Sequence, residues 1–282
     1  MNLKSIIDNL MNDMNNKIKF IGVDVGGTKI DLEGFDTALN SIVKYEVKTK
    51  VNQGLKGFLT QLEALIQAQW HPGIKGIALA MPGLVTQQGV VMHTPHIPIK
   101  KPLKLKEYFE KKYQTPVHVV NDVNAFLAAE YQEKKLKSYQ NIIAVMIGTG
   151  LGGAAIVNGA MIQGAHGYAG EFGHMIIRQD QKHATFEKNT SGTYVKATAK
   201  NKKTLLKQVG IGLSNLCSIF DPEVIVMGGS VYHYHLKADK TALKKIIQSY
   251  SLSGKSPQIV DGSSKTSVAK GAVLMGWPRT KK

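Results

Sequence analysis

Residues 23–30 read V-D-V-G-G-T-K-I, a glycine pair followed by Thr and Lys at the end of an apolar run. Glycines at such a turn let backbone N–H groups close on a phosphate, because no Cβ atoms intervene. P-loops and dinucleotide fingerprints place their glycines where a helix begins. Here the next residues alternate instead, with Ile30 and Leu32 on one side and acidic residues on the other, which is the period of a strand. The stretch therefore predicts a β-hairpin with a glycine tip.

The same pattern occurs a second time. Residues 142–157, I-I-A-V-M-I-G-T-G-L-G-G-A-A-I-V, repeat the apolar strand, glycine-rich tip and second apolar strand of residues 18–32. One phosphate hairpin in each half is typical of a duplicated fold that holds a nucleotide between its halves.

The remaining chain alternates between strand-like and helix-like segments, which indicates an α/β fold. We expect a short amphipathic helix in residues 1–17, an N-terminal lobe over 18–121 and a C-terminal lobe over 122–266, with the last helix, in 267–282, packing back on the first lobe. Within them we expect strands at 42–47, 74–80, 117–120 and 224–227, and helices at 55–66, 103–113, 124–134, 204–220 and 267–277.

The composition excludes several classes of protein. The chain has 282 residues, a formal charge of +16 and one cysteine, Cys217, so neither an intramolecular disulfide nor a cysteine-based zinc site can form. No apolar stretch approaches the length of a membrane span, and the N-terminus lacks the layout of a secretory signal. We expect a cytoplasmic protein.

The lysines are scattered over helical segments, which favours solvated faces over specific nucleic-acid binding.

Several polar residues are candidates for chemistry. Asp122 follows a buried strand and precedes a helix; it is a candidate general base, although Asn121 or Asp122 could equally serve as a helix N-cap. Asp24, before the first glycine tip, could stabilise the turn or hold Mg²⁺ through water. Lys29 could neutralise phosphate or point to solvent. In the segment G-Y-A-G-E-F-G-H, the Glu and His suit a polyhydroxylated substrate better than a metal, because further ligands are absent nearby in sequence.

Six motifs in register resemble the ROK family of sugar kinases and sugar-responsive repressors. They are D-V-G-G-T-K, A-M-P-G-L-V, N-D-V-N-A-F-L-A-A-E, G-T-G-L-G-G, G-A-H-G-Y-A-G-E-F-G-H and D-P-E-V-I-V-M-G-G-S. The resemblance covers the chain from about residue 18. It implies an actin-like (ribonuclease H-like, hexokinase-type) ATPase fold, with two α/β lobes around a cleft and a homodimeric assembly.

The resemblance also implies roles for individual residues. Asp122 becomes the catalytic base, and the sugar ligands become Asn121, Asp122, Glu171, His174 and Glu187, the last because F-E-K-N-T-S-G looks like the family's L-E-x-x-x-S-G. The residues that would surround the ATP phosphates and Mg²⁺ are Asp24, Gly26, Gly27, Thr28, Lys29, Gly148, Thr149 and Gly150. Among them, Asp24 would hold Mg²⁺ through water. Gly228 and Gly229 would lie near the nucleoside.

The chain departs from the family at two places. A cysteine-rich zinc hairpin is common between G-H and S-G, whereas here M-I-I-R-Q-D-Q-K-H-A-T-F-E intervenes, so we expect no zinc. The segment H-T-P-H-I-P-I-K-K-P also differs from the usual N-L-P pattern, which leaves the sugar open.

The expected function is an ATP-dependent hexose kinase acting on O6 of glucose or a related hexose. The alternatives are a β-glucoside or N-acetylmannosamine kinase and, from another class, a sugar-responsive regulator or a non-catalytic sugar sensor. A regulator would need a DNA-reading domain, and the 17 residues before the first strand are too few for one.

Overall fold

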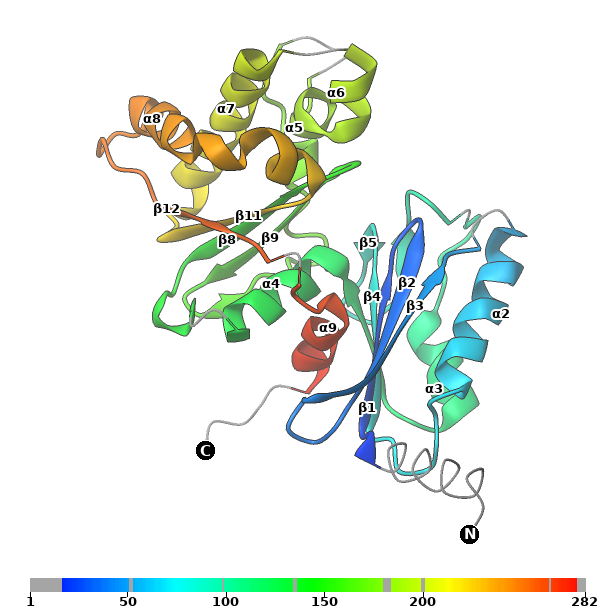
Figure 1. Ribbon diagram of the computed structural model, residues 1–282. Helices are drawn as coiled ribbons and strands as arrows, with labels where there is room; N and C mark the ends of the chain where they lie inside the picture. The colour runs from blue at the N-terminus through cyan, green and yellow to red at the C-terminus, as the bar shows by residue number, and fades with distance from the viewer. Residues whose placement is uncertain are drawn as a thin grey trace, which may run out of the picture. The chain divides into compact units, whose positions relative to one another are not determined.

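A computed structural model describes residues 17–50, 53–97, 99–133, 136–179, 184–198, 201–263 and 265–277 (Figure 1). The amphipathic helix expected before the first strand lies outside these residues, apart from Lys17. Within the described residues, no helix is both long enough and apolar enough to cross a membrane.

Contacts divide the chain into two compact units. Unit 1 comprises residues 1–129 and 267–282, and unit 2 comprises residues 130–266. This division falls a few residues beyond the boundary between the two lobes that the sequence predicts, at 121/122. The lobe boundary itself stays a prediction.

The sheet of unit 1 has the strand order β3-β2-β1-β4-β7. Strands β1, β2 and β3 form an antiparallel meander, whereas β1, β4 and β7 run parallel. The helices of unit 1 include α2, α3 and α9, and α4 begins there. The bounds are β1 Phe20–Val25, β2 Lys29–Phe35, β3 Ser41–Lys48, α2 Gly54–Gln67, β4 Gly76–Met81, β5 Leu84–Val85, β6 Val91–His93, α3 Leu105–Tyr113, β7 Val117–Asn121, α4 Asp122–Glu133 and α9 Val268–Gly276.

The two faces of this sheet have separate apolar cores. On one face, α2 and α3 bury aromatic and aliphatic side chains, among them Phe58 and Phe109, against the strands. On the other face, α9 packs against β1, β4 and β7. Gly271 also lets α9 lie close to α4, because a Cβ atom there would lie 1.8 Å from the carbonyl oxygen of Ala125 on α4. The helix that is last in sequence therefore completes the core of the unit that is first.

Unit 2 contains a second mixed sheet, with the order β10-β9-β8-β11-β12. The hairpin β8–β9 is antiparallel, and β8, β11 and β12 run parallel. Helices α5 and α7 pack on each other, as do α7 and α8. The bounds are β8 Ile142–Ile147, β9 Leu151–Val157, β10 Ala160–Met161, α5 Phe186–Thr190, α6 Gly192–Thr198, α7 Lys202–Phe220, β11 Val224–Gly228, α8 Lys240–Tyr250 and β12 Gln258–Asp261, with 3₁₀ turns η2 Leu136–Ser138, η3 Phe172–His174 and η5 Lys237–Asp239 and a π-helical turn η4 Tyr232–Leu236.

Both hairpins expected from the sequence are present. Strands β1 and β2 pair from Phe20 with Phe35 to Val25 with Ile30, and β8 and β9 pair from Ile142 with Ile156 to Ile147 with Leu151. The glycine tips follow β1 and β8, at the carboxyl ends of strands that are also parallel to β4 and to β11. Ligands of open α/β sheets bind at such ends.

The buried carboxylate of Glu130 joins the two places where the chain passes between units. Glu130 has no exposed surface. Its Oε1 accepts a hydrogen bond from the Ser263 backbone N–H at 2.9 Å and another from the Thr266 hydroxyl. The helix segment that enters unit 2 is thereby tied to the segment that leaves it.

Candidate functional site

The first glycine tip is fixed by its own turn and by β3. Gly26 N donates to the Lys29 carbonyl oxygen at 2.8 Å. Thr49, just after β3, donates its hydroxyl to the Gly26 carbonyl at 2.8 Å and its N–H to the Thr28 carbonyl at 3.0 Å. Because three carbonyls are thus engaged, the tip has a defined shape before any ligand binds.

Gly27, at the centre of the tip, lies against the ring of His96. A Cβ atom on Gly27 would be 2.5 Å from His96 Cδ2, so only glycine fits there without a shift of the ring. His96 belongs to the H-T-P-H-I-P-I-K-K-P segment that departs from the N-L-P pattern. The divergent loop therefore reaches the first glycine tip, a contact that the sequence did not indicate.

Asp24 is the last acidic residue before this tip and is partly buried. Its pKa is raised to about 7, mainly by burial and, to a smaller extent, by the nearby charges of Asp122 and Asp31. Asp24 and Asp31 face each other directly across the antiparallel pair of β1 and β2. One Oδ atom of Asp31 is buried and has no hydrogen-bond partner among the described residues. Lys29 and Lys44 offset only part of this carboxylate charge, and such an environment favours the binding of a cation.

The donor set fits magnesium bound together with phosphate. Mg²⁺ is held by one or two carboxylates plus water and phosphate oxygens, and Asp24 supplies such a carboxylate beside the glycine tip. Within the described residues there is no group of three or more His, Cys, Asp or Glu side chains that could hold a metal ion alone.

The Lys29 ammonium binds two carboxylates on neighbouring strands. Its Nζ lies 3.0 Å from Asp31 Oδ2 and 2.7 Å from Glu46 Oε2. These bonds raise the pKa of Lys29, with the bond to Glu46 as the larger cause. The side chain thus lies along the strands and balances part of the acidic charge near Asp24; its assignment to the donor phosphates stays a prediction.

Asn121, and not Asp122, accepts the hydrogen bonds typical of an N-cap at the start of α4. Asn121 Oδ1 accepts from the backbone N–H groups of Val123 and Asn124, at 2.8 and 3.1 Å, while its Nδ2 donates to the Gly83 carbonyl at 3.1 Å. Asp122 Oδ1 accepts from Val123 N at 2.9 Å, and the Asp122 side chain stays partly exposed. Because Asn121 serves as the cap, the structural role that competed with catalysis for Asp122 is already filled.

The second glycine tip, in unit 2, is supported by α6. Gly192 N donates to the Gly148 carbonyl at 2.7 Å, and the Thr193 hydroxyl donates to the Thr149 carbonyl at 2.9 Å. A Cβ atom on Gly192 would lie 2.9 Å from the Gly148 oxygen. The S-G-T run therefore supports the tip, a role that the sequence analysis did not assign to it.

The end of β11 adjoins the same tip. Gly229 has a left-handed backbone, with φ +87°, and a Cβ atom there would lie 2.4 Å from the Ile147 carbonyl oxygen. Ser230 Oγ lies 3.9 Å from the position that a Cβ of Gly148 would occupy. The end of β11 is thus brought beside the second tip, and the roles of Gly228 and Gly229 in nucleotide binding stay predictions.

Glu187 on α5 links this tip to the expected sugar ligands of unit 2. Its Oε2 accepts a hydrogen bond from Leu151 N at 2.7 Å and would lie 2.8 Å from a Cβ on Gly150. A Cβ on Gly173 would lie 3.3 Å from that of Glu187. The G-E-F-G-H segment therefore packs against the glutamate, although the two are separate in sequence.

Glu171 directly precedes the short turn η3, and His174 is the last residue of that turn. The His174 Nε2 is 3.9 Å from Glu171 Oε2, and the His174 side chain is 79% exposed. Unit 2 thus brings Glu171, His174 and Glu187 together, whereas unit 1 brings together Asp24, the first tip, Asn121 and Asp122. Their roles in binding stay predictions.

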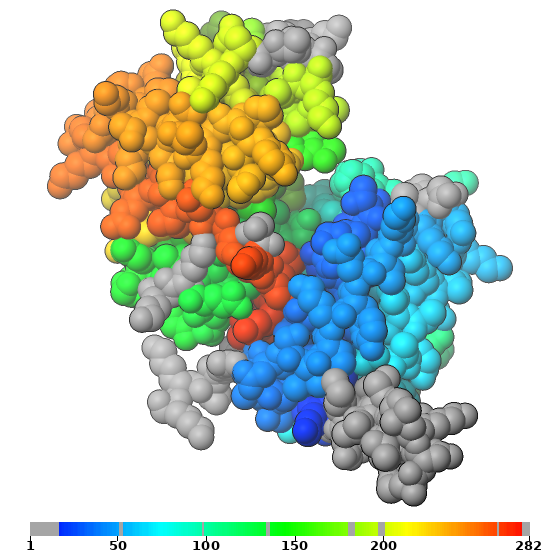
Figure 2. All heavy atoms as spheres, viewed as in Figure 1, coloured from blue at the N-terminus to red at the C-terminus, as the bar shows by residue number. Residues whose placement is uncertain are grey.

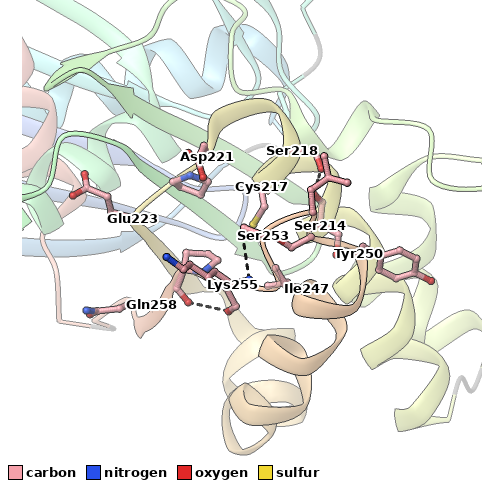
Figure 3. A pocket seen from close by; sticks show the side chains of 15 residues that line it. Ser214, Cys217, Ser218, Asp221, Glu223, Ile247, Tyr250, Ser253, Lys255 and Gln258 are labelled. Atoms are coloured by element: carbon pink, nitrogen blue, oxygen red, sulfur yellow. Dashed lines mark hydrogen bonds between the residues drawn. The ribbon is translucent and has the colours of Figure 1, made fainter.

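A separate cavity of about 760 Å³ lies at the other edge of the unit 2 sheet, where β11 and β12 begin (Figure 3). Its lining includes Cys217, Asp221, Tyr250, Lys255 and several serines. Burial raises the pKa of the Cys217 thiol to about 11, and the charge of Asp221 adds to the shift. The cysteine therefore lies at the end of the unit 2 sheet opposite to the second glycine tip, and it is held as a neutral thiol.

The family model described as the ROK family matches residues 20–208. The chain belongs to the ROK family. The actin-like, hexokinase-type fold expected from the resemblance is confirmed by the solved structures of this family, which share the architecture described above.

Individual relatives are similar to this ROK protein over different lengths. An N-acetyl-D-glucosamine kinase of Pectobacterium carotovorum is 31% identical over 162 residues, which are 57% of this chain and 53% of that one. This ROK chain thus spans about half the length of the N-acetyl-D-glucosamine kinases it matches. A glucokinase of Halalkalibacterium halodurans is 26% identical and covers 86% of this chain and 88% of its own.

Among solved structures, a ROK family glucokinase from Streptomyces griseus, in complex with glucose and AMPPNP, superposes with a TM-score of 0.75. It is 23% identical and covers 90% of this chain and 98% of its own. At this identity the likeness shows the fold alone.

Proposed function

We propose that this protein is an ATP-dependent sugar kinase. The observation that carries the proposal is the position of Asp122. Asp24 pairs with Ala80 on β4, and Ala80 pairs with Val120 on β7, so Asp122 emerges at the same sheet edge as Asp24 and the glycine tip. A base and a phosphate-binding hairpin at one edge are the parts that phosphoryl transfer needs.

In the proposed reaction, a hydroxyl oxygen of the sugar attacks the γ-phosphorus of ATP and the bond to the β-phosphate oxygen breaks. The hydroxyl proton passes to the Asp122 carboxylate. Mg²⁺, when bound beside Asp24, would neutralise charge on the phosphate oxygens. The backbone of the Gly26–Gly27 tip would hold the phosphates, and Asn121 would orient the base by fixing the first turn of α4.

The sugar is proposed from the relatives and the site. The relatives are N-acetyl-D-glucosamine kinases and a glucokinase, so phosphorylation at O6 of glucose or an N-acetylhexosamine is the first reaction to test. Glu171, His174 and Glu187 supply two carboxylates and an imidazole, which suit sugar hydroxyls. A homodimer in the cytoplasm completes the proposal.

The test is coupled ADP release with a panel of N-acetyl-D-glucosamine, N-acetylmannosamine, glucose, mannose and a β-glucoside. The proposal expects one sugar to raise turnover far above the ATPase background. A regulator or sensor would bind sugar without turnover, so calorimetric titration of the same panel separates these classes from the kinase.

A further inference from the structure

A groove of about 800 Å³ lies in unit 1 between the edge strand β3 and helix α2. Figure 2 shows the blue surfaces of β3 and α2 on the face of unit 1 turned to the viewer. The groove is separate from the residues assigned above to catalysis, and it is lined by Val47, Lys48, Lys50, Gln53, Lys56, Gly57, Thr60, Gln61, Ala64 and Leu65.

The charge of this lining is of one sign. Lys48, Lys50 and Lys56 are exposed, and none of the described lining residues is acidic. In the part of the chain that the structure describes, no carboxylate pairs with any of the three ammonium groups. This contrasts with Lys29 and Lys44 on the neighbouring stretch of sheet, which bind Glu46 and Glu33.

The start of α2 adds to the positive potential. The helix begins at Gly54, its first turn contains no acidic residue, and the side chain of Gln53 makes no capping hydrogen bond. Lys56 lies in that first turn, where a cation is electrostatically unfavourable, because the N–H groups of the turn are already positive. An anion in the groove would relieve this repulsion.

The groove also adjoins the first glycine tip. Thr49 lies between Lys48 and Lys50 and holds the carbonyls of Gly26 and Thr28. The backbone that presents two of the lysines is therefore the backbone that fixes the tip.

The remaining lining residues are uncharged, and among them Gln53, Thr60 and Gln61 are polar. Gln61 is fixed, with Oε1 accepting from Lys50 N at 2.9 Å and Nε2 donating to the Lys48 carbonyl at 2.7 Å, whereas Thr60 and Gln53 offer a hydroxyl and an amide. Among the residues that the structure describes, no aromatic side chain lines the groove, and aromatic side chains are the groups on which the bases of single-stranded nucleic acids stack.

We propose that this groove is a second anion site, which binds a phosphorylated small molecule through the ammonium groups of Lys48, Lys50 and Lys56. The ligand chemistry is a compact group with several negative charges, supplied either by a phosphorylated sugar or by a short inorganic phosphate chain. Lysine binds such groups as a point charge. The proposal goes beyond the sugar kinase function proposed above, and it stands or falls separately, because ligand binding to the groove needs neither ATP nor sugar.

The test is calorimetric titration with two probes, tripolyphosphate and glucose 6-phosphate, without nucleotide or sugar. The variant carries Lys48→Gln, Lys50→Gln and Lys56→Gln. The matched control carries Lys75→Gln, Lys111→Gln and Lys137→Gln, which remove the same charge at exposed positions elsewhere. Thermal denaturation checks that both variants are folded.

The proposal expects at least one probe to bind the wild type and the control, with an affinity that is lower by about tenfold or more in the groove variant. Preference for tripolyphosphate would identify a phosphate chain, and preference for glucose 6-phosphate a sugar phosphate. Equal weakening in both variants would show general charge attraction and overturn the proposal, as would the absence of binding of either probe to the wild type. If the wild type binds a probe in the groove but phosphorylates no sugar of the panel, the proposed sugar kinase function fails and the anion site stands.

Discussion

Asp24 and Asp31 face each other across strands β1 and β2, in the carboxylate-rich edge that also includes Asp122. Like charges directly opposite each other in an antiparallel pair are destabilising. In this protein Asp24 carries the destabilisation of its charged form. Its pKa is raised to about 7, by burial first and by the neighbouring charges second.

The first prediction concerns the pH dependence of stability. A carboxyl with a raised pKa in the folded state binds its proton more tightly than in the unfolded chain, so its contribution to stability is full below about pH 4 and is lost as the pH rises through about 7. Asp24→Asn should therefore stabilise the protein above pH 7, by about 1–3 kcal/mol, with little gain at acidic pH. Urea unfolding of both proteins between pH 4 and 8, in magnesium-free buffer, measures the difference. A gain that stays constant over this range would show that Asp24 keeps an ordinary pKa.

The second prediction concerns the base. Asp122→Asn should lower the rate of phosphoryl transfer by roughly 10²- to 10⁴-fold. It should leave the fold intact, because Asn121 still caps α4 and an asparagine oxygen can accept from Val123 N. The measurements are coupled ADP release and thermal denaturation, with Glu107→Gln, an exposed carboxylate elsewhere in unit 1, as control. Near-normal turnover in Asp122→Asn would mean that another group takes the proton.

The third prediction separates the two roles of Glu187. Glu187→Ala removes the acceptor of Leu151 N, and an unpaired buried N–H costs about 1–3 kcal/mol. Glu187→Gln keeps an acceptor oxygen but loses the charge. We expect Glu187→Ala to melt at a lower temperature than Glu187→Gln. Both variants should show a higher KM for sugar than the wild type. If the two variants melt alike, the bond to Leu151 contributes little to the second tip.

The fourth prediction concerns Cys217 in the cavity of Figure 3. Its pKa of about 11 should make alkylation by iodoacetamide at pH 8 roughly 10- to 100-fold slower than in the urea-unfolded chain. Asp221→Asn should speed the reaction, because the Asp221 charge helps to raise this pKa, and asparagine tolerates the left-handed backbone at that position. Mass spectrometry of the modified protein between pH 7 and 10 follows both rates. Native labelling as fast as in the unfolded chain would contradict the assignment.

The sequence predicted the parts of the site that depend on local pattern. Period-two alternation after Gly27 predicted the first hairpin, and the duplicate at residues 142–157 predicted β8 and β9. The strand and helix on either side of Asp122 were also predicted, because a buried apolar run and a polar cap are local signals.

Features that depend on distant partners could not be read in this way. The direction of Lys29 was left open, since it is set by Glu46, 17 residues away on another strand. The supports of the two tips come from Thr49 and Thr193, at separations of 23 and 44 residues. Helix α8 and the π-helical turn before it were not predicted either. For α8 a local signal was present, because Leu243, Ile246 and Ile247 recur at helical spacing among the lysines.

The packing of α9 on β1, β4 and β7 has a consequence for the order of events during synthesis. Strands β1, β4 and β7 emerge from the ribosome long before α9, and until α9 is made the apolar face formed by Phe20, Ala78 and Val120 lacks its cover. Domains generally fold as they are synthesised, N-terminal first. In this protein unit 1 cannot complete its folding before unit 2 has been translated. The nascent sheet of unit 1 is therefore the segment on which a chaperone would act.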